Sequence, residues 1–132
     1  MAALRKILVV DDEPAVLLTY ELVLRHQGYD VASASSPKEA EELLARSKFD
    51  MLICDLGLRG EQDGLGVIET ARRQYPGIGC LLLTGFAEPE ISEAAASKGI
   101  RLLLKPVHLP ELLSTIRLLV GGDRAEETPR AS

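Results

Sequence analysis

Four short apolar runs, each followed by a polar or charged residue, constrain the fold of this chain most strongly. Three of the runs cover residues 7–10, 51–54 and 78–83, and the fourth, 100–104, is apolar apart from Arg101. The residues that follow them are, in order, Asp11-Asp12, Asp55, Thr84 and Lys105. A continuous apolar run of this length is typical of a strand that is buried on both faces, as in a parallel sheet. Each of the four predicted strands therefore ends in a side chain capable of chemistry.

Between these runs, apolar residues recur at the spacing of an α-helix. The predicted helices cover about 15–27, a segment that begins at Ser36-Pro37, about 65–75, 89–98 and 108–120. Gly28 and Gly99 follow two of these helices, where a left-handed glycine commonly ends a helix. Ser36, Pro37 and Glu39 form a capped helix start. Strands and helices thus alternate along the chain.

Residues 29–33 alternate weakly between apolar and polar side chains, as an outer strand does. With this strand the chain has five strands alternating with five helices. Right-handed crossovers then predict an α/β fold, namely a doubly wound, flavodoxin-like parallel sheet of order 2-1-3-4-5 with helices on both faces. A chain of 132 residues fits one domain, predicted over 1–120, and the polar segment 121–132 is predicted to be a disordered tail.

Composition narrows the classes of partner. The formal net charge is −5, and the chain has no Trp, two Phe and three Tyr, which argues against nucleic-acid binding. No apolar run approaches the roughly 18 residues of a membrane span, so no membrane association and a cytoplasmic location are expected. Proteins or cations are the expected partners.

Cys54 and Cys80 both fall in predicted strands, where the simplest interpretation is a small buried apolar residue. If Asp55 and Thr84 lie level at the strand tips, Cys80 lies about 10 Å lower along the neighbouring strand. That separation exceeds the reach of a disulfide, so we expect both thiols to be free.

The residues at the strand ends form one constellation in the order 2-1-3-4-5. Strands one, three, four and five are neighbours in that order, so their terminal residues converge on one edge of the sheet. Clustered carboxylates such as Asp11, Asp12 and Asp55 are best held by a hard divalent cation, Mg²⁺ or Mn²⁺. The ammonium of Lys105 and the hydroxyl of Thr84 then supply a positive charge and a donor. This set fits phosphoryl transfer.

Asp55 is the predicted nucleophile of this set. No Ser, Cys or His is placed to act there, and acyl phosphates on aspartate are an established covalent chemistry. Asp11 and Asp12 are adjacent and therefore better suited to a metal ion. Gly85, next to Thr84, lets a backbone N–H approach a phosphoryl oxygen without an intervening Cβ.

With these residues in register, the chain resembles the receiver domain of two-component response regulators from Lys6 to about Leu119. The matching segments are Val9-Val10-Asp11-Asp12-Glu13-Pro14, Asp55, Asp63-Gly64, Leu83-Thr84-Gly85 and Lys105-Pro106. The resemblance implies that Asp55 accepts a phosphoryl group from a phosphohistidine of a sensor histidine kinase or a histidine phosphotransfer protein. The phosphoryl group would then switch interactions in signal transduction.

The resemblance also assigns roles to individual residues. It implies that Asp12 and Asp55 bind Mg²⁺ with the backbone carbonyl of Gly57, that Asp11 assists through water, and that the backbones of Gly57 and Gly85 face the phosphoryl group. It implies a cis Lys105-Pro106 peptide bond. The domain is expected to catalyse only its own phosphorylation and dephosphorylation, and not to be an enzyme with an external substrate. Its predicted surface for an effector or for self-association comprises the helix at 89–98, the strand at 100–104 and the helix at 108–120.

Several positions depart from the family pattern. Arg59 stands where a proline is usual, Asp63-Gly64 comes one residue late, and Gly57 has no side chain to tune hydrolysis. Leu102 stands where the family carries a switch aromatic, so coupling from Thr84 is expected to run through an aliphatic residue such as Leu102 or through Phe86.

Three other functions remain open from the sequence. A receiver-like interaction module that works without phosphorylation is the main alternative, and the missing aromatic favours it. A second alternative is a hydrolase with an aspartate nucleophile. Such an enzyme needs a general acid two residues after the nucleophile, and Gly57 at that position argues against it. A flavin- or nucleotide-binding protein needs a phosphate-binding loop after the first strand, where Asp11-Asp12 repels phosphate instead.

Overall fold

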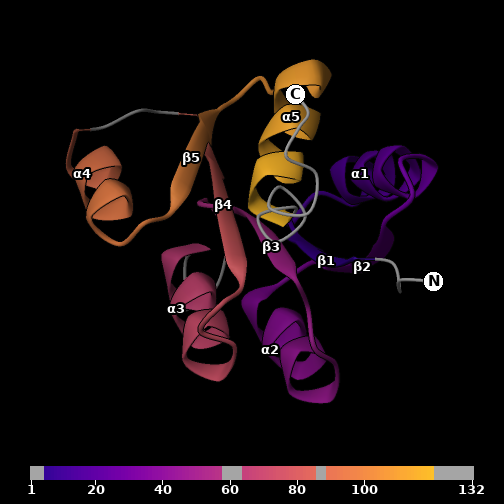
Figure 1. Ribbon diagram of the computed structural model, residues 1–132, viewed down its shortest axis with the longest axis horizontal. Coiled ribbons are helices and arrows are strands. Elements are labelled where there is room, and N and C mark those ends of the chain that lie inside the picture. Colours follow the sequence, from indigo (N-terminus) through magenta and orange to yellow (C-terminus); the bar gives the residue numbers. More distant parts are fainter. Residues whose placement is uncertain (1–4, 58–63, 86–88, 121–132) are drawn as a thin grey trace, which may run out of the picture.

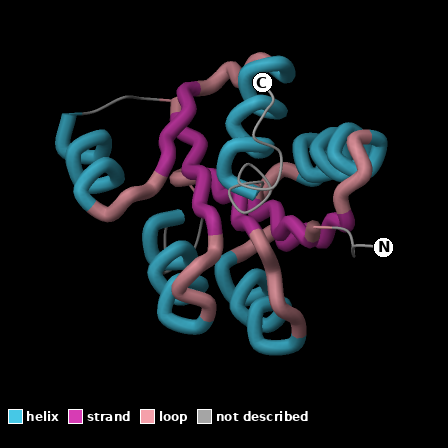
Figure 2. The backbone as a smooth tube through the Cα atoms, viewed as in Figure 1, coloured by secondary structure: helices cyan, strands magenta, loops and turns pink. Residues whose placement is uncertain are grey.

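The computed structural model describes residues 5–57, 64–85 and 89–120 and contains five strands and five helices in these ranges (Figures 1 and 2). The strands are β1 (Lys6–Val10), β2 (Asp30–Ala34), β3 (Met51–Asp55), β4 (Gly79–Thr84) and β5 (Arg101–Leu104). The helices are α1 (Pro14–His26), α2 (Pro37–Arg46), α3 (Gly64–Gln74), α4 (Pro89–Ser97) and α5 (Leu109–Val120). Each boundary predicted from the sequence lies within one residue of the observed one.

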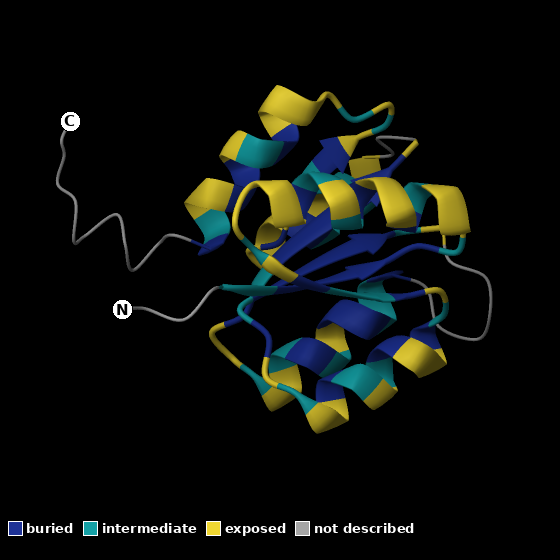
Figure 3. Cartoon of the chain, turned by 90° about the vertical axis from the view of Figure 1, so that its right-hand side faces the viewer, coloured by how far each residue is buried: buried dark blue, intermediate teal, exposed yellow. Residues whose placement is uncertain are grey.

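The strands form one sheet of order β2-β1-β3-β4-β5, and every pairing is parallel, as predicted. Two hydrophobic clusters flank it. Helices α1 and α5 pack on one face, and α2, α3 and α4 pack on the other, so the sheet is covered on both sides (Figures 1 and 3). The predicted doubly wound fold is therefore confirmed.

Side chains along each strand alternate between the two clusters, as the pleat requires. On β3, Met51 and Ile53 face α1 and α5, whereas Leu52 and Cys54 face the opposite side. The strand is buried along its whole length, which explains why its sequence is an unbroken apolar run until Asp55.

Local signals fix several element ends. The Ser36 hydroxyl accepts a hydrogen bond from the Glu39 N–H at 3.1 Å, and Glu39 Oε1 accepts one from the Ser35 N–H at 2.7 Å. These two bonds begin α2 in the manner of a capping box. Gly28 and Gly99 have φ values of +95° and +72°, in the left-handed region that favours glycine.

The strand register corrects one expectation. Asp55 pairs with Leu83, so Thr84 lies one residue beyond the level of Asp55 instead of beside it. The same register places Cys80 opposite Leu52, two residues below Cys54 on the neighbouring strand. Both cysteines are buried and free, as expected.

Two expectations concern membrane association and the tail. None of the helices within the described ranges is long and apolar enough to cross a membrane. The predicted tail at 121–132 lies outside the described residues.

Candidate functional site

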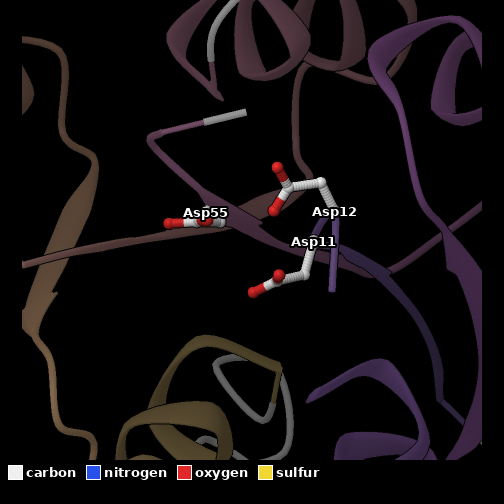
Figure 4. A group of neighbouring side chains, drawn as sticks. All are labelled: Asp11, Asp12 and Asp55. Carbon is white, nitrogen blue, oxygen red and sulfur yellow. The ribbon is translucent and has the colours of Figure 1, made fainter. Parts of the chain in front are cut away.

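Three carboxylates meet at the carboxyl edge of the sheet (Figure 4). Asp11 and Asp12 directly follow β1, Asp55 ends β3, and these two strands are neighbours with Val10 opposite Cys54. One oxygen of each carboxylate lies within 4.8 Å of the others. Asp11 and Asp55 are buried and Asp12 is half-buried. The adjacency of β1 and β3, which the apolar runs predict, is what brings the acids together.

Lys105 is the cation of this site. Its Nζ lies 3.1 Å from Asp55 Oδ1 and 3.9 Å from Asp11 Oδ2. Its backbone N–H donates to the Thr84 carbonyl at 2.8 Å, which holds the residue at the end of β5 next to β4. Partial burial lowers the pKa of Lys105, but the hydrogen bond and charge of Asp55, with the charge of Asp11, raise it above its ordinary value. Lys105 is therefore a fixed positive charge beside Asp55.

Asp11 is the most buried of the three acids, with 1% of its surface exposed. Its Oδ1 accepts a hydrogen bond from the Glu13 N–H at 3.0 Å, whereas the buried Oδ2 has no hydrogen-bond partner among the described residues. Burial raises the pKa of Asp11, the Glu13 N–H and Lys105 oppose this, and the charges of Asp55 and Asp12 add to the rise. Asp11 and Asp55 thus share the ammonium group of Lys105.

This donor set fits a hard divalent cation. Carboxylate oxygens are the ligands that Mg²⁺ and Mn²⁺ prefer, and three carboxylates within 4.8 Å of one another favour a doubly charged ion. The buried Oδ2 of Asp11, which lacks a hydrogen-bond partner in the described part of the chain, is available to such an ion or to a water molecule bound to it.

Replacing Asp11 by asparagine is expected to stabilise the protein in the absence of divalent cations. Because the pKa of Asp11 is raised in the folded state, its contribution to stability is present below the ordinary value of 3.8 and is lost as pH rises through the folded-state pKa. Asparagine keeps the acceptor for the Glu13 N–H and carries no charge. We expect a gain of about 1 kcal/mol at neutral pH, measured by thermal unfolding in a chelator.

The control for this variant is the exposed acid Asp30, at the start of β2 and away from the cluster. An Asp30→Asn variant has the same net charge as Asp11→Asn and should unfold like the wild type. The gain from Asp11→Asn should shrink as pH falls toward 3.8. Equal melting temperatures for the two variants at pH 7.5 would contradict the prediction.

Thr84, Gly57 and Gly85 lie around the cluster. Thr84 is buried at the end of β4. The Gly57 N–H lies 3.4 Å from Asp55 Oδ1, so this backbone group already faces the predicted nucleophile. A Cβ built on Gly57 or Gly85 would contact none of the described residues within 4 Å.

The predicted switch positions occupy different places on β4 and β5. Leu102 pairs with Leu82 and packs against the cluster formed by α2, α3 and α4. Leu104 pairs with Thr84 and is 50% exposed, which makes it the direct strand neighbour of Thr84. Phe86 lies outside the described residues.

Sequence reasoning missed a structural role for Gly64 and a position near the site for Tyr20. A Cβ on Gly64 would lie 2.5 Å from the Asp55 carbonyl oxygen, so α3 begins in direct contact with the backbone of the predicted nucleophile. The sequence feature that could have indicated this role is the glycine at the start of the helix. Burial raises the pKa of Tyr20, Lys105 lowers it, and Asp11 and Asp55 raise it, which places this α1 phenol within electrostatic reach of the site. The sequence feature that could have indicated the position of Tyr20 is an aromatic residue on the buried side of α1.

Comparisons of sequence agree with this geometry. Residues 7–117 match the family model described as the response regulator receiver domain. The chain is 40% identical over 102 residues, 76% of its length, to the alginate biosynthesis transcriptional regulatory protein AlgB of Pseudomonas aeruginosa. It is 33% identical over 128 residues, 95% of its length, to the response regulator protein PilR of the same species. It spans 22% and 28% of the lengths of these relatives.

Solved structures show the same fold. A CheY-like receiver domain protein from Methanospirillum hungatei superposes with a TM-score of 0.86 at 28% identity, covering 94% of this chain and 99% of that one. The response regulator TrrA of Thermotoga maritima, solved in complex with Mg²⁺ and BeF, superposes with a TM-score of 0.77 at 26% identity, covering 88% and 99%. The family match, the fold and the acidic cluster agree, and the chain belongs to the response regulator receiver domain family.

Proposed function

We propose that Asp55 accepts a phosphoryl group from a phosphohistidine of a sensor histidine kinase or a histidine phosphotransfer protein. The observation that carries this proposal is the position of Asp55 between an acid pair and an ammonium group. Lys105 Nζ lies 3.1 Å from Asp55 Oδ1, and Asp11 and Asp12 place oxygens within 4.8 Å of the Asp55 carboxylate. A carboxylate placed in this way is oriented, partly desolvated and next to a fixed positive charge.

In the transfer step an Asp55 carboxylate oxygen forms a bond to phosphorus. The bond between phosphorus and the imidazole nitrogen breaks, and its electron pair stays on the imidazole. The Lys105 ammonium neutralises charge on the phosphoryl oxygens, and the Thr84 hydroxyl and the backbone N–H groups of Gly57 and Gly85 donate hydrogen bonds to them. The products are an acyl phosphate on Asp55 and a free histidine side chain.

Asp11, Asp12, Asp55 and the Gly57 carbonyl would hold Mg²⁺ or Mn²⁺. When bound, this ion supplies positive charge to the phosphoryl oxygens. The chain's own part is to hold the three carboxylates within 4.8 Å of one another before any ion arrives. That arrangement is costly without an ion, as the raised pKa of Asp11 indicates.

The domain acts as a switch and not as an enzyme with an external substrate, and its place of action is the cytoplasm. Phosphorylation shifts a population between two forms that differ by a few kcal/mol.

The surface formed by α4, β5 and α5 is the proposed contact for an effector or a second copy. Leu104 and Leu118 are 50% and 64% exposed there. The β4–β5 ladder joins this surface to the site through Thr84 and its strand neighbour Leu104.

One observation favours a second candidate, an interaction module that works without phosphorylation. Leu102 stands at the position of the family's switch aromatic and is packed against the α2, α3 and α4 cluster. An aliphatic side chain held in this way has no ring to rotate on phosphorylation.

Treatment with phosphoramidate and Mg²⁺, followed by intact-mass measurement, separates the two candidates. We expect the wild-type protein to gain the mass of one phosphoryl group and the Asp55→Asn variant to gain none. Asp50→Asn is the matched control, because Asp50 immediately precedes β3 at the opposite end of the strand from Asp55. The absence of an adduct on the wild type, or an adduct that persists in Asp55→Asn, would reject phosphorylation of Asp55.

A further inference from the structure

A second concave site, here called the amino-end pocket, lies at the end of the sheet where the strands begin. The strand arrowheads in Figure 3 point away from this end of the molecule. The pocket has a volume of about 520 Å³, in the range of small-molecule sites. Its walls come from the residue before β1, the segment before β3, the segment between α3 and β4, and the last residues of α5. None of its described lining residues belongs to the site around Asp55.

Internal hydrogen bonds hold one wall of the amino-end pocket. The Tyr75 hydroxyl lies 2.8 Å from the Leu44 carbonyl oxygen and 3.0 Å from the Ser47 carbonyl oxygen. The side-chain amide of Gln74 donates to the same Leu44 carbonyl at 3.0 Å. These bonds tie the end of α3 to the end of α2, so this wall is already in place without a ligand.

Arg5 is the polar group of the pocket that the protein leaves unsatisfied. Its Nε is buried and has no hydrogen-bond partner among the described residues. Its Nη1 lies 3.9 Å from Asp50 Oδ1, beyond hydrogen-bond distance, and Asp50 Oδ2 already accepts the Lys6 N–H at 2.8 Å. The Arg5 side chain is still 25% exposed, so a ligand can reach its guanidinium group. A guanidinium group with unused donors favours an external acceptor.

The remaining lining indicates which acceptor fits. Arg5 and Lys48 are its two cations and Asp50 is its one acid, so the lining carries one positive charge in excess. A monoanion therefore balances it, and the fork of a guanidinium group matches a carboxylate. The apolar part of the lining consists of Phe49, Ile78, Leu119 and Val120.

We propose that the amino-end pocket binds a small organic monocarboxylate with a compact apolar body, such as an aromatic acid. Its carboxylate pairs with the Arg5 guanidinium and the Lys48 ammonium, and its apolar body packs against Ile78 and Val120. The bound acid would join the end of α5 to the starts of β3 and β4. This inference goes beyond the proposed function, because it gives the domain a ligand at the end of the sheet opposite Asp55.

The test titrates ¹⁵N-labelled full-length chain with benzoate and follows the backbone amide chemical shifts. Benzoate has few atoms, so a Kd on the order of 1 mM is expected. The shifts should concentrate at pocket residues such as Ile78 and Val120 and leave Asp55 unchanged. Benzamide has the same shape without the charge, so it should bind at least about tenfold more weakly. Phthalate carries a second carboxylate and should also bind more weakly than benzoate.

Arg5→Met should weaken benzoate binding at least about tenfold, because it removes the guanidinium group and keeps a long side chain. Arg46→Met is the matched control, since Arg46 is an exposed arginine at the end of α2 outside the pocket, and it should keep the wild-type affinity. Thermal unfolding checks that both variants are folded.

Three outcomes would overturn the inference. They are the absence of pocket shifts with about 10 mM benzoate, benzamide or phthalate binding as tightly as benzoate, and a folded Arg5→Met variant with wild-type affinity. The comparison of the three ligands uses the wild-type protein, so it decides the question even if Arg5→Met does not fold. Phosphorylation by phosphoramidate is measured separately, so a failure here leaves the proposed function intact.

Discussion

Replacing Lys105 by methionine is expected to slow phosphorylation of Asp55 by about 10²–10³-fold, the usual effect of removing one preorganised donor from a charge-stabilising site. Methionine keeps much of the length of the side chain and removes the ammonium that lies 3.1 Å from Asp55 Oδ1. Within the described residues, Lys105 forms an ion pair with both Asp55 and Asp11. The variant therefore leaves three carboxylates facing a phosphoryl group that is itself negative.

The measurement is the rate of adduct formation with phosphoramidate and Mg²⁺, and Lys105→Arg is the matched control. Arginine retains the positive charge and should recover part of the rate, although its planar group does not reproduce a compact ammonium. A methionine variant that reacts within threefold of the wild type would show that Lys105 does not stabilise the transition state. Thermal unfolding of both variants separates this effect from a loss of folded protein.

Much of the site follows from the sequence because β1, β3 and β4 are buried on both faces. An unbroken apolar run can end only where the strand leaves the core, so the residue after each run locates the sheet edge. Asp55 follows one such run and Asp11-Asp12 follow another. Once the predicted strand order places these two strands side by side, the three acids must lie close together. Predicted boundaries within one residue were sufficient for this purpose.

Register and the approach of neighbouring elements do not follow from periodicity. Thr84 lies one residue beyond Asp55 because Met51 pairs with Gly79, so β4 continues for one residue past the level at which β3 ends. Tyr20 belongs to the inward stripe of α1, but its position beside Lys105 depends on α1 and α5 packing on the same face. The contact of Gly64 with the Asp55 backbone depends on where the chain returns after residues 58–63. These three features arise from tertiary packing.

Strand pairing connects Leu104, an exposed residue of β5, to the edge of the candidate site. It is the strand neighbour of Thr84, and Lys105, which follows it, donates its N–H to the Thr84 carbonyl at 2.8 Å. If Asp55 is phosphorylated as proposed, a displacement of Thr84 toward the phosphoryl group would be transmitted to an exposed residue of β5. Leu102 offers no aromatic ring for such coupling, whereas the pairing of Thr84 with Leu104 offers a backbone connection.

Gly64→Ala is the second substitution with a large expected effect, because the added Cβ meets backbone atoms that no rotamer change can move. It would lie 2.5 Å from the Asp55 carbonyl oxygen and 2.9 Å from the Leu56 Cα. Gly64 also donates its N–H to the Leu56 carbonyl at 3.2 Å, so α3 cannot retreat without losing that bond. Overpacking of this kind typically costs about 1–3 kcal/mol of stability, measurable by denaturant unfolding.

Gly64→Ala is expected to affect the rate of phosphorylation more than the stability. The added Cβ would displace Leu56, and Asp55 and Gly57 are the residues on either side of Leu56. Displacing a nucleophile by about 1 Å can cost as much as 10²-fold in rate, so phosphorylation should slow by between about tenfold and that value. Gly77→Ala is the matched control, since a Cβ there contacts nothing within 4 Å and Gly77 has no positive φ. If Gly64→Ala loses stability but phosphorylates as fast as Gly77→Ala, the helix start supports the fold without positioning the nucleophile. If it loses neither, α3 adjusts to the methyl group and the close approach is not a constraint.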